Sequence, residues 1–460
     1  MTNDRTRIDL GPSYARKIEL RRALTPDVFT IPTAEQQALL TSMSRADYRA
    51  IIAASLGRHL TFEEAFHAGC FALRASNRAI AQALLDLDVP SFGDDGDRLA
   101  ARELLSGLAM KESWSTLEPQ EIAGLVTAVH MDVVDFCSYG SVIETCGMGG
   151  DRGHQVNGEH KRCKTINSST LTALTLASLG LKTCKHGSYA NTSAIGSTEA
   201  IEKLGLVVDV ADRDVQRQLA ASGFHYTDAH GWKTVHDLSH LEPRRETVNH
   251  ILGPMTIPVC PNTKLNKMLG VNEKLHPERV ARAYQLLHER GTYCVNNVAV
   301  IAGLSTVISD EEAREDHLVK PLVILDELSP FSTVVSFVKG GQFHRTLVLT
   351  PRDFGVTFRD PRSVFVENTG DAIMTANRQT IYGVEEGRQL VAYLAMNAAL
   401  GLYLVEYMDV DAGFTPNGRP STEMLRDCFR RCESALLEGR AHGLLVAQVE
   451  LTSRLSRERT

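Results

Sequence analysis

Three short segments of this chain carry the residue types that bind phosphate groups. The first, Gly147–Asp151, contains three glycines followed by an aspartate. The second, Thr165–Thr170, is rich in Ser and Thr and opens an apolar helix, and the third is Lys185–Ser188. Glycines let backbone N–H groups approach a phosphate, a helix N-terminus adds partial positive charge, and a lysine supplies a full cation. The sequence therefore predicts a site for a phosphorylated sugar.

A pair of adjacent carboxylates, Asp326 and Glu327, directly follows the apolar run Leu322–Leu325. Carboxylate oxygens suit Mg²⁺, which proteins often share with substrate phosphates. An ordinary charged turn would explain the pair by itself. However, this pair, Gly147–Asp151 and Lys185–Ser188 each follow a predicted strand, and ligands of open α/β sheets gather outside the carboxyl ends of the strands. We therefore predict that Asp326 and Glu327 hold Mg²⁺ at the phosphate site.

The elements that must position these segments change in type near residue 137. Residues 1–35 are predicted to be an N-terminal extension, and residues 36–136 a small helical domain joined by part of 262–292. Within it, Thr61 and Glu64 form a predicted capping box at the start of a helix over 61–75. Residues 137–460 alternate β-rich runs with helices, which is the α/β pattern. We expect a mainly parallel central sheet in this larger domain, with the site in the cleft between the two domains.

The α/β part contains several elements that the pattern predicts individually. The predicted strands are residues 142–145, 181–184, 293–300, 322–325 and 345–349, and the predicted closing helices are residues 382–403 and 422–437. These runs are apolar and bounded by Gly, Pro or polar residues, as strands and core helices are.

Composition and charge exclude several classes of protein. The formal net charge of −7 argues against a nucleic-acid coat, which needs a basic face. No apolar run reaches the length of a membrane span, and the N-terminus has no apolar core of a secretory signal. The nine cysteines contain no CxxC pair, so reduced thiols are expected. We expect a cytoplasmic protein that binds neither nucleic acid nor membranes.

Taken together, the motifs resemble those of the anthranilate phosphoribosyltransferase family, within the wider class that also holds the pyrimidine nucleoside phosphorylases. The family pattern GTGGD corresponds to GMGGD at Gly147–Asp151, T-x-N-x-S-T to Thr165–Thr170, and KHGN to KHGS at Lys185–Ser188. The family's LDE corresponds to LDELSP from Leu325. Several motifs in a preserved order are much more specific than any single motif.

The resemblance implies an activity, a cofactor and an assembly. The family moves a phosphoribosyl group from phosphoribosyl pyrophosphate (PRPP) to the nitrogen of an aromatic amine and releases pyrophosphate. It implies Mg²⁺ and a homodimer. Catalysis would rest on positioning and on electrostatic stabilisation of the leaving group by Lys185, Asp326 and Glu327, not on a covalent intermediate.

The resemblance also implies the residues of the site. Those implied to bind PRPP are Gly147, Gly150, Asp151, Thr165, Asn167, Ser169, Thr170, Lys185, Ser193 and Ser197. Those implied to hold metal are Ser169, Asp326 and Glu327. Those implied to face the acceptor are Gly147, His186, Ser188, His230 and His240.

Departures from the family pattern cluster on the acceptor side. Ser188 replaces the asparagine of KHGN, and His240 stands where the family has the arginine that grips the carboxylate of anthranilate. A guanidinium offers a bidentate fork that an imidazole lacks, although Arg244 and Arg245 are near enough in sequence to substitute. The expected acceptor is therefore anthranilate or a related aromatic or heteroaromatic compound.

Other interpretations remain open from the sequence. One is a nucleoside phosphorylase that uses inorganic phosphate on the same scaffold, and another is a non-catalytic relative that binds nucleic acid. The polar insert 152–163 is expected to form a lid over the phosphate loop. A zinc site is conceivable from His154, His160, Cys163, Cys184 and His186, but their spacing fits no standard set. Cys428 and Cys432 are expected to be packing residues.

Overall fold

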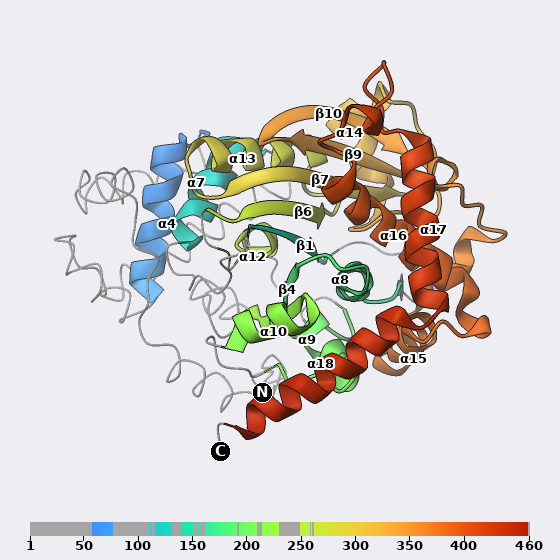
Figure 1. The fold of residues 1–460 in the computed structure, drawn as a ribbon. Coiled ribbons are helices and arrows are strands. Elements are labelled where there is room, and N and C mark those ends of the chain that lie inside the picture. The colour runs from blue at the N-terminus through green and yellow to red at the C-terminus, as the bar shows by residue number, and fades with distance from the viewer. Residues whose placement is uncertain are drawn as a thin grey trace, which may run out of the picture. The chain divides into compact units, whose positions relative to one another are not determined.

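The computed structural model describes residues 58–76, 111, 116–130, 140–150, 154–155, 162–190, 193–208, 214–229, 249–257, 259 and 262–458. The chain divides into two compact units (Figure 1). The first is Met1–Phe136 with Ala229–Val259, and the second is Cys137–Asp228 with Cys260–Thr460. Part of residues 262–292 was expected to join the helical domain. These residues instead lie in the second unit, because they contain a strand of its large sheet and a helix that packs on this sheet.

In the first unit, three helices are described: α4 (Phe62–Ser76), α7 (Pro119–His130) and α12 (Asn249–Met255). The predicted capping box at the start of α4 is confirmed. The Thr61 N–H donates to Oε2 of Glu64 at 3.0 Å, and the Glu64 N–H donates to Oγ1 of Thr61 at 3.2 Å. Most of the remainder of the helical domain predicted over residues 36–136 lies outside the described residues.

The second unit is built on one large sheet, in the order β10-β9-β7-β6-β1-β4-β5, with β8 also paired to β7. The strands are β1 (Ser141–Gly147), β4 (Thr183–Gly187), β5 (Phe224–Asp228), β6 (Lys264–Gly270), β7 (Cys294–Leu304), β8 (Val323–Leu325), β9 (Ser332–Lys339) and β10 (Gln342–Leu349). The pairs among β5, β4, β1, β6 and β7 are parallel, whereas β8 and β9 pair with β7 antiparallel and β10 pairs with β9 antiparallel. The expected α/β class with a mainly parallel sheet is confirmed.

Helices cover both faces of this sheet (Figure 1). The described helices of the second unit are α8 (Ser168–Ser178), α9 (Ser197–Lys203), α10 (Val215–Ser222), α13 (Pro277–Glu289), α14 (Asp316–Val319), α15 (Gly370–Ile381), α16 (Arg388–Glu406), α17 (Thr422–Leu437) and α18 (Arg440–Arg457). Short 3₁₀ turns lie at Glu312–Arg314, Lys320–Leu322, Pro351–Phe354, Pro361–Val364, Glu385–Gly387 and Asp411–Gly413. Helix α16 packs against α8, β1, β6 and β7, whereas α13 packs against β7, β9 and β10.

The start of α16 differs from the predicted helix over 382–403. Gly383 has a φ of +64°, a left-handed conformation that glycine adopts easily, and it separates α15 from α16. A single helix from residue 382 was therefore wrong at its first turn and a half.

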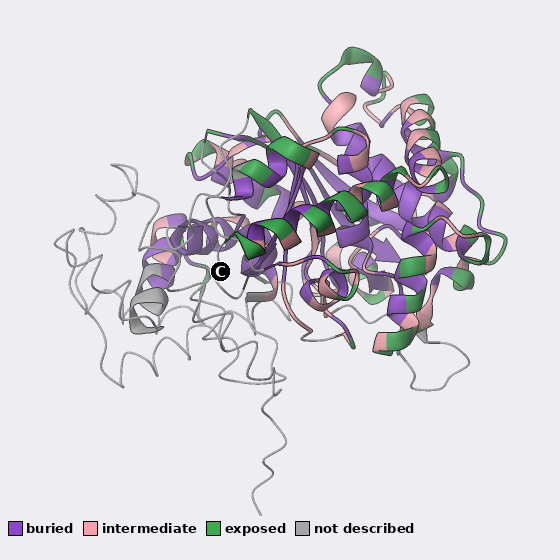
Figure 2. Ribbon diagram, turned by 60° about the horizontal axis from the view of Figure 1, so that its bottom comes forward, coloured by how far each residue is buried: buried purple, intermediate pink, exposed green. Residues whose placement is uncertain are grey.

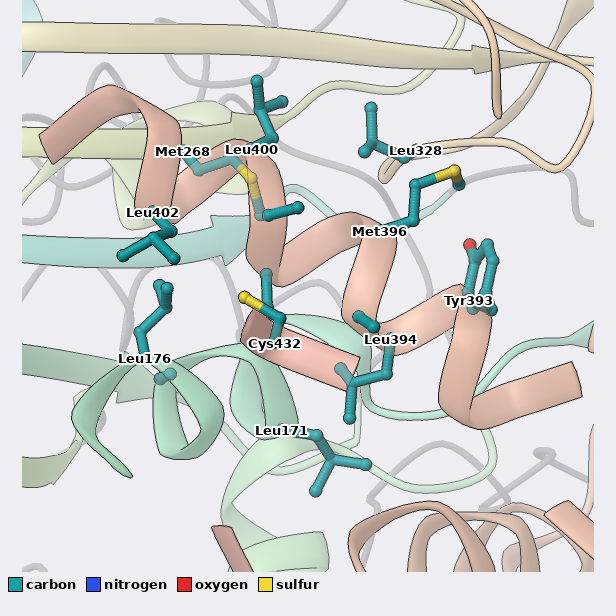
Figure 3. Packing of buried hydrophobic residues seen from close by; sticks show 14 of the residues in the cluster. Leu171, Leu176, Met268, Leu328, Tyr393, Leu394, Met396, Leu400, Leu402 and Cys432 are labelled. Atoms are coloured by element: carbon teal, nitrogen blue, oxygen red, sulfur yellow. The ribbon is translucent and has the colours of Figure 1, made fainter. Parts of the chain in front are cut away.

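Helix α16 is the centre of the hydrophobic core of the second unit (Figure 3). Its Leu394, Leu400 and Leu402 belong to one buried cluster with Leu171 and Leu176 of α8. Most strand residues of the large sheet are buried, while exposed residues lie on the outer faces of the helices and in loops (Figure 2). Among the described residues, α16 with its preceding turn is the one helix long and apolar enough to cross a membrane, but 78% of that window is buried in this core. The expected packing role of Cys428 and Cys432 is confirmed, since both belong to the same cluster.

A second, three-stranded sheet has the order β11-β3-β2. Its strands are β2 (His154–Gln155), β3 (Arg162–Lys164) and β11 (Val366–Glu367). Both ends of the polar insert therefore form antiparallel strands rather than a loop, because β3 finds backbone partners in β11 just before α15. The tip of the insert, 156–161, lies outside the described residues.

Candidate active site

The carboxylate of Asp326 lies against the glycine loop that follows β1. The Gly149 N–H donates to Oδ2 of Asp326 at 2.6 Å. Gly147 and Gly270 are register partners at the carboxyl ends of the parallel strands β1 and β6. A Cβ atom on Gly147 would overlap the Asp326 carboxylate, and one on Gly270 would overlap the Asp326 main-chain carbonyl. Glycine at both positions therefore lets Asp326 reach the carboxyl edge of the parallel strands.

Asp326 reaches this edge by a different path from the one expected. Strand β8, which precedes it, runs antiparallel to β7, so Asp326 is not at the carboxyl end of a parallel strand. Because β8 has only three residues, the chain turns across the ends of β6 and β1 directly after Leu325. The two predicted segments are brought together nevertheless.

Glu327 is held by donors from two distant parts of the second unit. The Thr165 hydroxyl donates to Oε1 of Glu327, and the Tyr393 hydroxyl of α16 donates to the same oxygen at 2.9 Å. Burial and the charge of Glu327 raise the pKa of Tyr393 well above its usual value. Tyr393 therefore stays protonated and acts as a fixed donor.

The N-terminus of α8 is held open by an asparagine pair. Asn167 occupies the N-cap position, but its side chain makes no capping hydrogen bond to the helix. Instead, the Asn167 N–H donates to Oδ1 of Asn377 at 2.9 Å, and Nδ2 of Asn377 donates to Oδ1 of Asn167 at 2.7 Å. Asparagine is among the best N-cap residues, so this pairing withdraws a group that would otherwise occupy the first amides of α8. The Ser168 and Thr170 N–H groups donate to the carbonyls of Ile166 and Asn167, so the Ser169 N–H is the candidate donor to a phosphate at this helix N-terminus.

The hydroxyl-bearing side chains in the first turn of α8 differ in their exposure to solvent. Thr145 of β1 donates its hydroxyl hydrogen to the Ser169 carbonyl at 2.7 Å, which fixes the helix to the sheet. Ser169 is partly exposed, whereas Thr170 is fully buried. Ser169 is therefore the better placed of these two predicted ligands.

Lys185 is buried in the middle of β4, and burial lowers the pKa of its ammonium. Its Nζ donates to the carbonyl of His186 and lies 5.9 Å from the centre of the Tyr226 ring. In the described arrangement this ammonium is thus bound by its own strand end, and a phosphate contact requires a rotation of its side chain.

The segment after β4 folds back on the start of α9. The Ser193 hydroxyl donates to the Ile195 carbonyl at 2.8 Å, and the N–H groups of Ala190 and Gly196 donate to Oε2 of Glu199 at 3.0 and 2.6 Å. Ser197 and Ser188 are partly exposed along this segment. Glu199 therefore fixes the shape of the predicted phosphate-binding segment.

On the opposite side of β1 from α8, the sheet carries a buried polar cluster. Ile143 faces the core with α8, so Glu144 and Cys146, which alternate with it, face the other way. Oε2 of Glu144 is paired with Nζ of Lys267 on β6, and Oε1 of Glu144 lies 3.1 Å from Nδ1 of His186 on β4. Burial lowers the pKa of Lys267 well below its usual value. Of these residues, only His186 was identified from the sequence.

Three of the predicted site residues, Asp151, His230 and His240, lie outside the described residues. Gly150 is described and has a φ of +69°, which favours glycine. Four residues that shape the site were not predicted from the sequence: Tyr393, Asn377, Gly270 and Glu199. Their roles depend on partners far along the chain or on close backbone approach, and no local pattern marks them.

The donor set at Asp326 and Glu327 fits Mg²⁺. Both groups are carboxylates, they lie beside the glycine loop and Thr165, and Mg²⁺ prefers such oxygen ligands. Asp326, Glu327 and Ser169 would hold the ion, which when bound supplies charge neutralisation for substrate phosphates.

Comparison with known proteins agrees with this fold. Residues 140–322 match the glycosyl transferase family, a/b domain. The chain is 27% identical over 369 residues to the anthranilate phosphoribosyltransferase of Dictyoglomus turgidum, covering 78% of this chain and 90% of that protein. It is 28% identical over 365 residues to that of Xanthomonas campestris pv. campestris, covering 76% and 86%.

Solved structures show the same fold. The anthranilate phosphoribosyltransferase of Thermus thermophilus has a TM-score of 0.59 and 21% identity, with 88% of this chain and 99% of that chain covered. The Saccharomyces cerevisiae enzyme in complex with PRPP and Mg has a TM-score of 0.62 and 20% identity, with 89% and 99% covered. The fold and the matched domain define a glycosyltransferase, and more narrowly an enzyme that transfers a pentosyl group. Within that class, the chain is similar to anthranilate phosphoribosyltransferases over about three quarters of its length.

Proposed function

We propose that this protein transfers a phosphoribosyl group from PRPP to an aromatic amine or heteroaromatic acceptor in a Mg²⁺-dependent reaction that releases pyrophosphate. The observation that carries the proposal is the meeting of Asp326, the Gly147–Gly150 loop and Thr165 through Glu327. Two carboxylates beside a loop that binds phosphate would repel a polyanion by themselves. They would help to bind it when a cation is held between them and the phosphates. The names of the relatives support the same substrate class.

The proposed reaction breaks the bond between C1 of the ribose and the pyrophosphate oxygen, and pyrophosphate leaves with the electron pair. The acceptor nitrogen forms the new bond to C1 and loses its proton. Positive charge develops on the ribose and negative charge on the leaving group. Preorganised N–H donors of the glycine loop and of the start of α8 would stabilise that negative charge, and Mg²⁺ would neutralise part of it.

A binding and turnover experiment tests this function. The full chain would be titrated with PRPP with and without Mg²⁺, and then assayed for pyrophosphate release with anthranilate and a panel of aromatic amines. Metal-dependent PRPP binding with acceptor-dependent pyrophosphate release supports the proposal. Turnover of a nucleoside with inorganic phosphate would instead identify a phosphorylase. Binding of neither substrate would leave a non-catalytic relative.

The acceptor, the assembly and the location are further parts of the proposal. We expect anthranilate or a related compound, because Ser188 changes the acceptor side of the motif. We also expect a cytoplasmic homodimer. Sedimentation velocity of the full chain checks the dimer, and a single species of monomer mass would contradict it.

A further inference from the structure

The buried polar cluster on β1 and β4 has the side chains of a site for a metal ion that accepts nitrogen and sulfur ligands. Glu144 and Cys146 on β1 and His186 on β4 place one ligand atom each within 4.8 Å of one another. Glu144 is 0% exposed and His186 is 3% exposed, whereas Cys146 is partly exposed. Cys146 therefore marks the side from which an ion could enter.

The pair of Glu144 and His186 supplies a second, independent observation. Oε1 of Glu144 lies 3.1 Å from Nδ1 of His186, yet it is buried and accepts no hydrogen bond. A buried carboxylate oxygen without a hydrogen bond is costly. Zinc bonds of about 2.0–2.1 Å to oxygen and nitrogen put two tetrahedral ligand atoms about 3.3 Å apart. The observed distance between the two atoms is close to this ligand-to-ligand distance. A cation bound to both atoms would therefore satisfy the buried Oε1 of Glu144.

Lys267 leaves room for this role, because it pairs with the other oxygen of Glu144. Its Nζ lies at Oε2, while Oε1 faces His186 and Cys146. Glu144 would therefore act as a monodentate ligand oriented by Lys267. Supporting contacts of this kind fix the ligands of metal sites.

We propose that Glu144, Cys146 and His186 form a zinc-class metal site, separate from the Mg²⁺ site at Asp326 and Glu327. A thiolate, an imidazole and a carboxylate suit Zn²⁺ and not Mg²⁺. Three protein ligands leave a fourth position for water or for a donor atom of a small molecule, as in zinc sites that bind ligands. The set differs from the one conceivable from sequence spacing, since it draws on alternate residues of one strand and on the neighbouring strand.

Metal titration of the full chain tests the site. Protein freed of metal with a chelator would be titrated with Zn²⁺ in competition with a chromophoric chelator, in the presence of excess Mg²⁺. We expect one equivalent of Zn²⁺ that Mg²⁺ does not displace. Substitution with Co²⁺ should give a thiolate-to-cobalt charge-transfer band in the near ultraviolet.

Cys146→Ser is the decisive variant, because Cys146 is partly exposed and its replacement keeps the size of the side chain. We expect the Zn²⁺ affinity to fall by roughly 100-fold and the charge-transfer band to disappear. Cys294→Ser, which also removes a partly exposed thiol at the start of a strand, is the matched control and should bind as the wild type does. Absence of a one-equivalent site, or equal Zn²⁺ binding and an unchanged band in Cys146→Ser, would overturn the proposal.

Discussion

At the scale of single residues, Asp326 and Glu327 differ from most surface carboxylates because loop donors hold them. Replacing both as Asp326→Asn with Glu327→Gln keeps their shapes and removes two negative charges. We expect turnover to fall by roughly 10²-fold or more, since the leaving pyrophosphate loses its metal-based stabilisation. Steady-state rates at saturating PRPP and Mg²⁺, with circular dichroism to verify folding, measure the effect.

A control for this variant is available in the same unit. Glu385 and Glu386 are also adjacent, and both are at least partly exposed. Glu385→Gln with Glu386→Gln should leave turnover unchanged. Wild-type turnover in the variant at Asp326 and Glu327 would remove these residues from the metal site.

The site residues that could be predicted from the sequence are those marked by their immediate neighbours in the chain. Gly147 and Gly150 stand out by spacing, and Asp326 stands out because it follows an apolar strand. Asn377 could not be predicted, because its partner Asn167 is 210 residues away and an asparagine within a helix carries no signal of its own. Glu144 was hidden for a similar reason, since its neighbours in space come from β4 and β6.

At the scale of elements, α15 supports the phosphate-binding end of α8 through Asn377. Asn377→Ala would free the Asn167 side chain to cap α8 and cover the Ser169 N–H, the candidate phosphate donor. Loss of two hydrogen bonds worth about 1 kcal/mol each predicts a rise of up to about 30-fold in the KM for PRPP, with a smaller change in kcat. Initial rates over a range of PRPP concentrations measure this.

Thr380→Val on the same helix is the matched control. The Thr380 hydroxyl donates only to the Ala376 carbonyl one turn earlier among its described hydrogen bonds, and the residue is fully buried. Its loss should lower thermal stability without changing the KM for PRPP. Equal KM values in Asn377→Ala and the wild type would contradict the support role.

The close approach of Asp326 to the ends of β1 and β6 predicts a second effect between elements. Gly270→Ala would place a methyl group on the Asp326 carbonyl, so the chain after β8 must move. We expect loss of most Mg²⁺-dependent PRPP binding together with a lower melting temperature. Gly140→Ala has open space around its Cβ and should change neither quantity. Calorimetric titration with PRPP and Mg²⁺ measures binding, and unaltered binding in Gly270→Ala would refute the steric argument.

Strand β6 was not predicted from the sequence, and its charged residues explain why. Strand β6 reads KLNKMLG, and its Lys267 is buried in an ion pair with Glu144. Charged residues inside a strand normally indicate a solvated face, so tertiary pairing overrode the pattern. The antiparallel direction of β8 relative to β7 could not be predicted either, because a run of three residues does not indicate which strand it pairs with.

At the scale of the whole molecule, a buried histidine makes stability depend on pH. Burial lowers the pKa of His130 at the end of α7 from 6.5 to about 4. The unfolded chain therefore binds a proton below about pH 6.5 that the folded chain does not bind until about pH 4. The free energy of unfolding of the first unit should fall by up to about 3 kcal/mol as pH decreases through this window.

Urea unfolding of the full chain at several pH values between 7 and 4, compared with His130→Gln, isolates this contribution. The variant should lose less stability on acidification than the wild type. His317→Gln removes an exposed imidazole of the second unit and should follow the wild type. Parallel pH dependence in the wild type and His130→Gln would show that His130 does not couple protonation to folding.

The position of α16 in the chain has a consequence for biosynthesis. This helix fills the centre of the second unit, yet its residues 388–406 follow every strand of the large sheet. During translation, β1, β6, β7 and α8 are therefore completed before the helix that covers their apolar side chains exists. Contacts between such distant segments form slowly, and exposed apolar surface favours aggregation. A ribosome that stalls before residue 388 would release a chain with an uncovered sheet, and such a fragment should need a chaperone to stay dispersed.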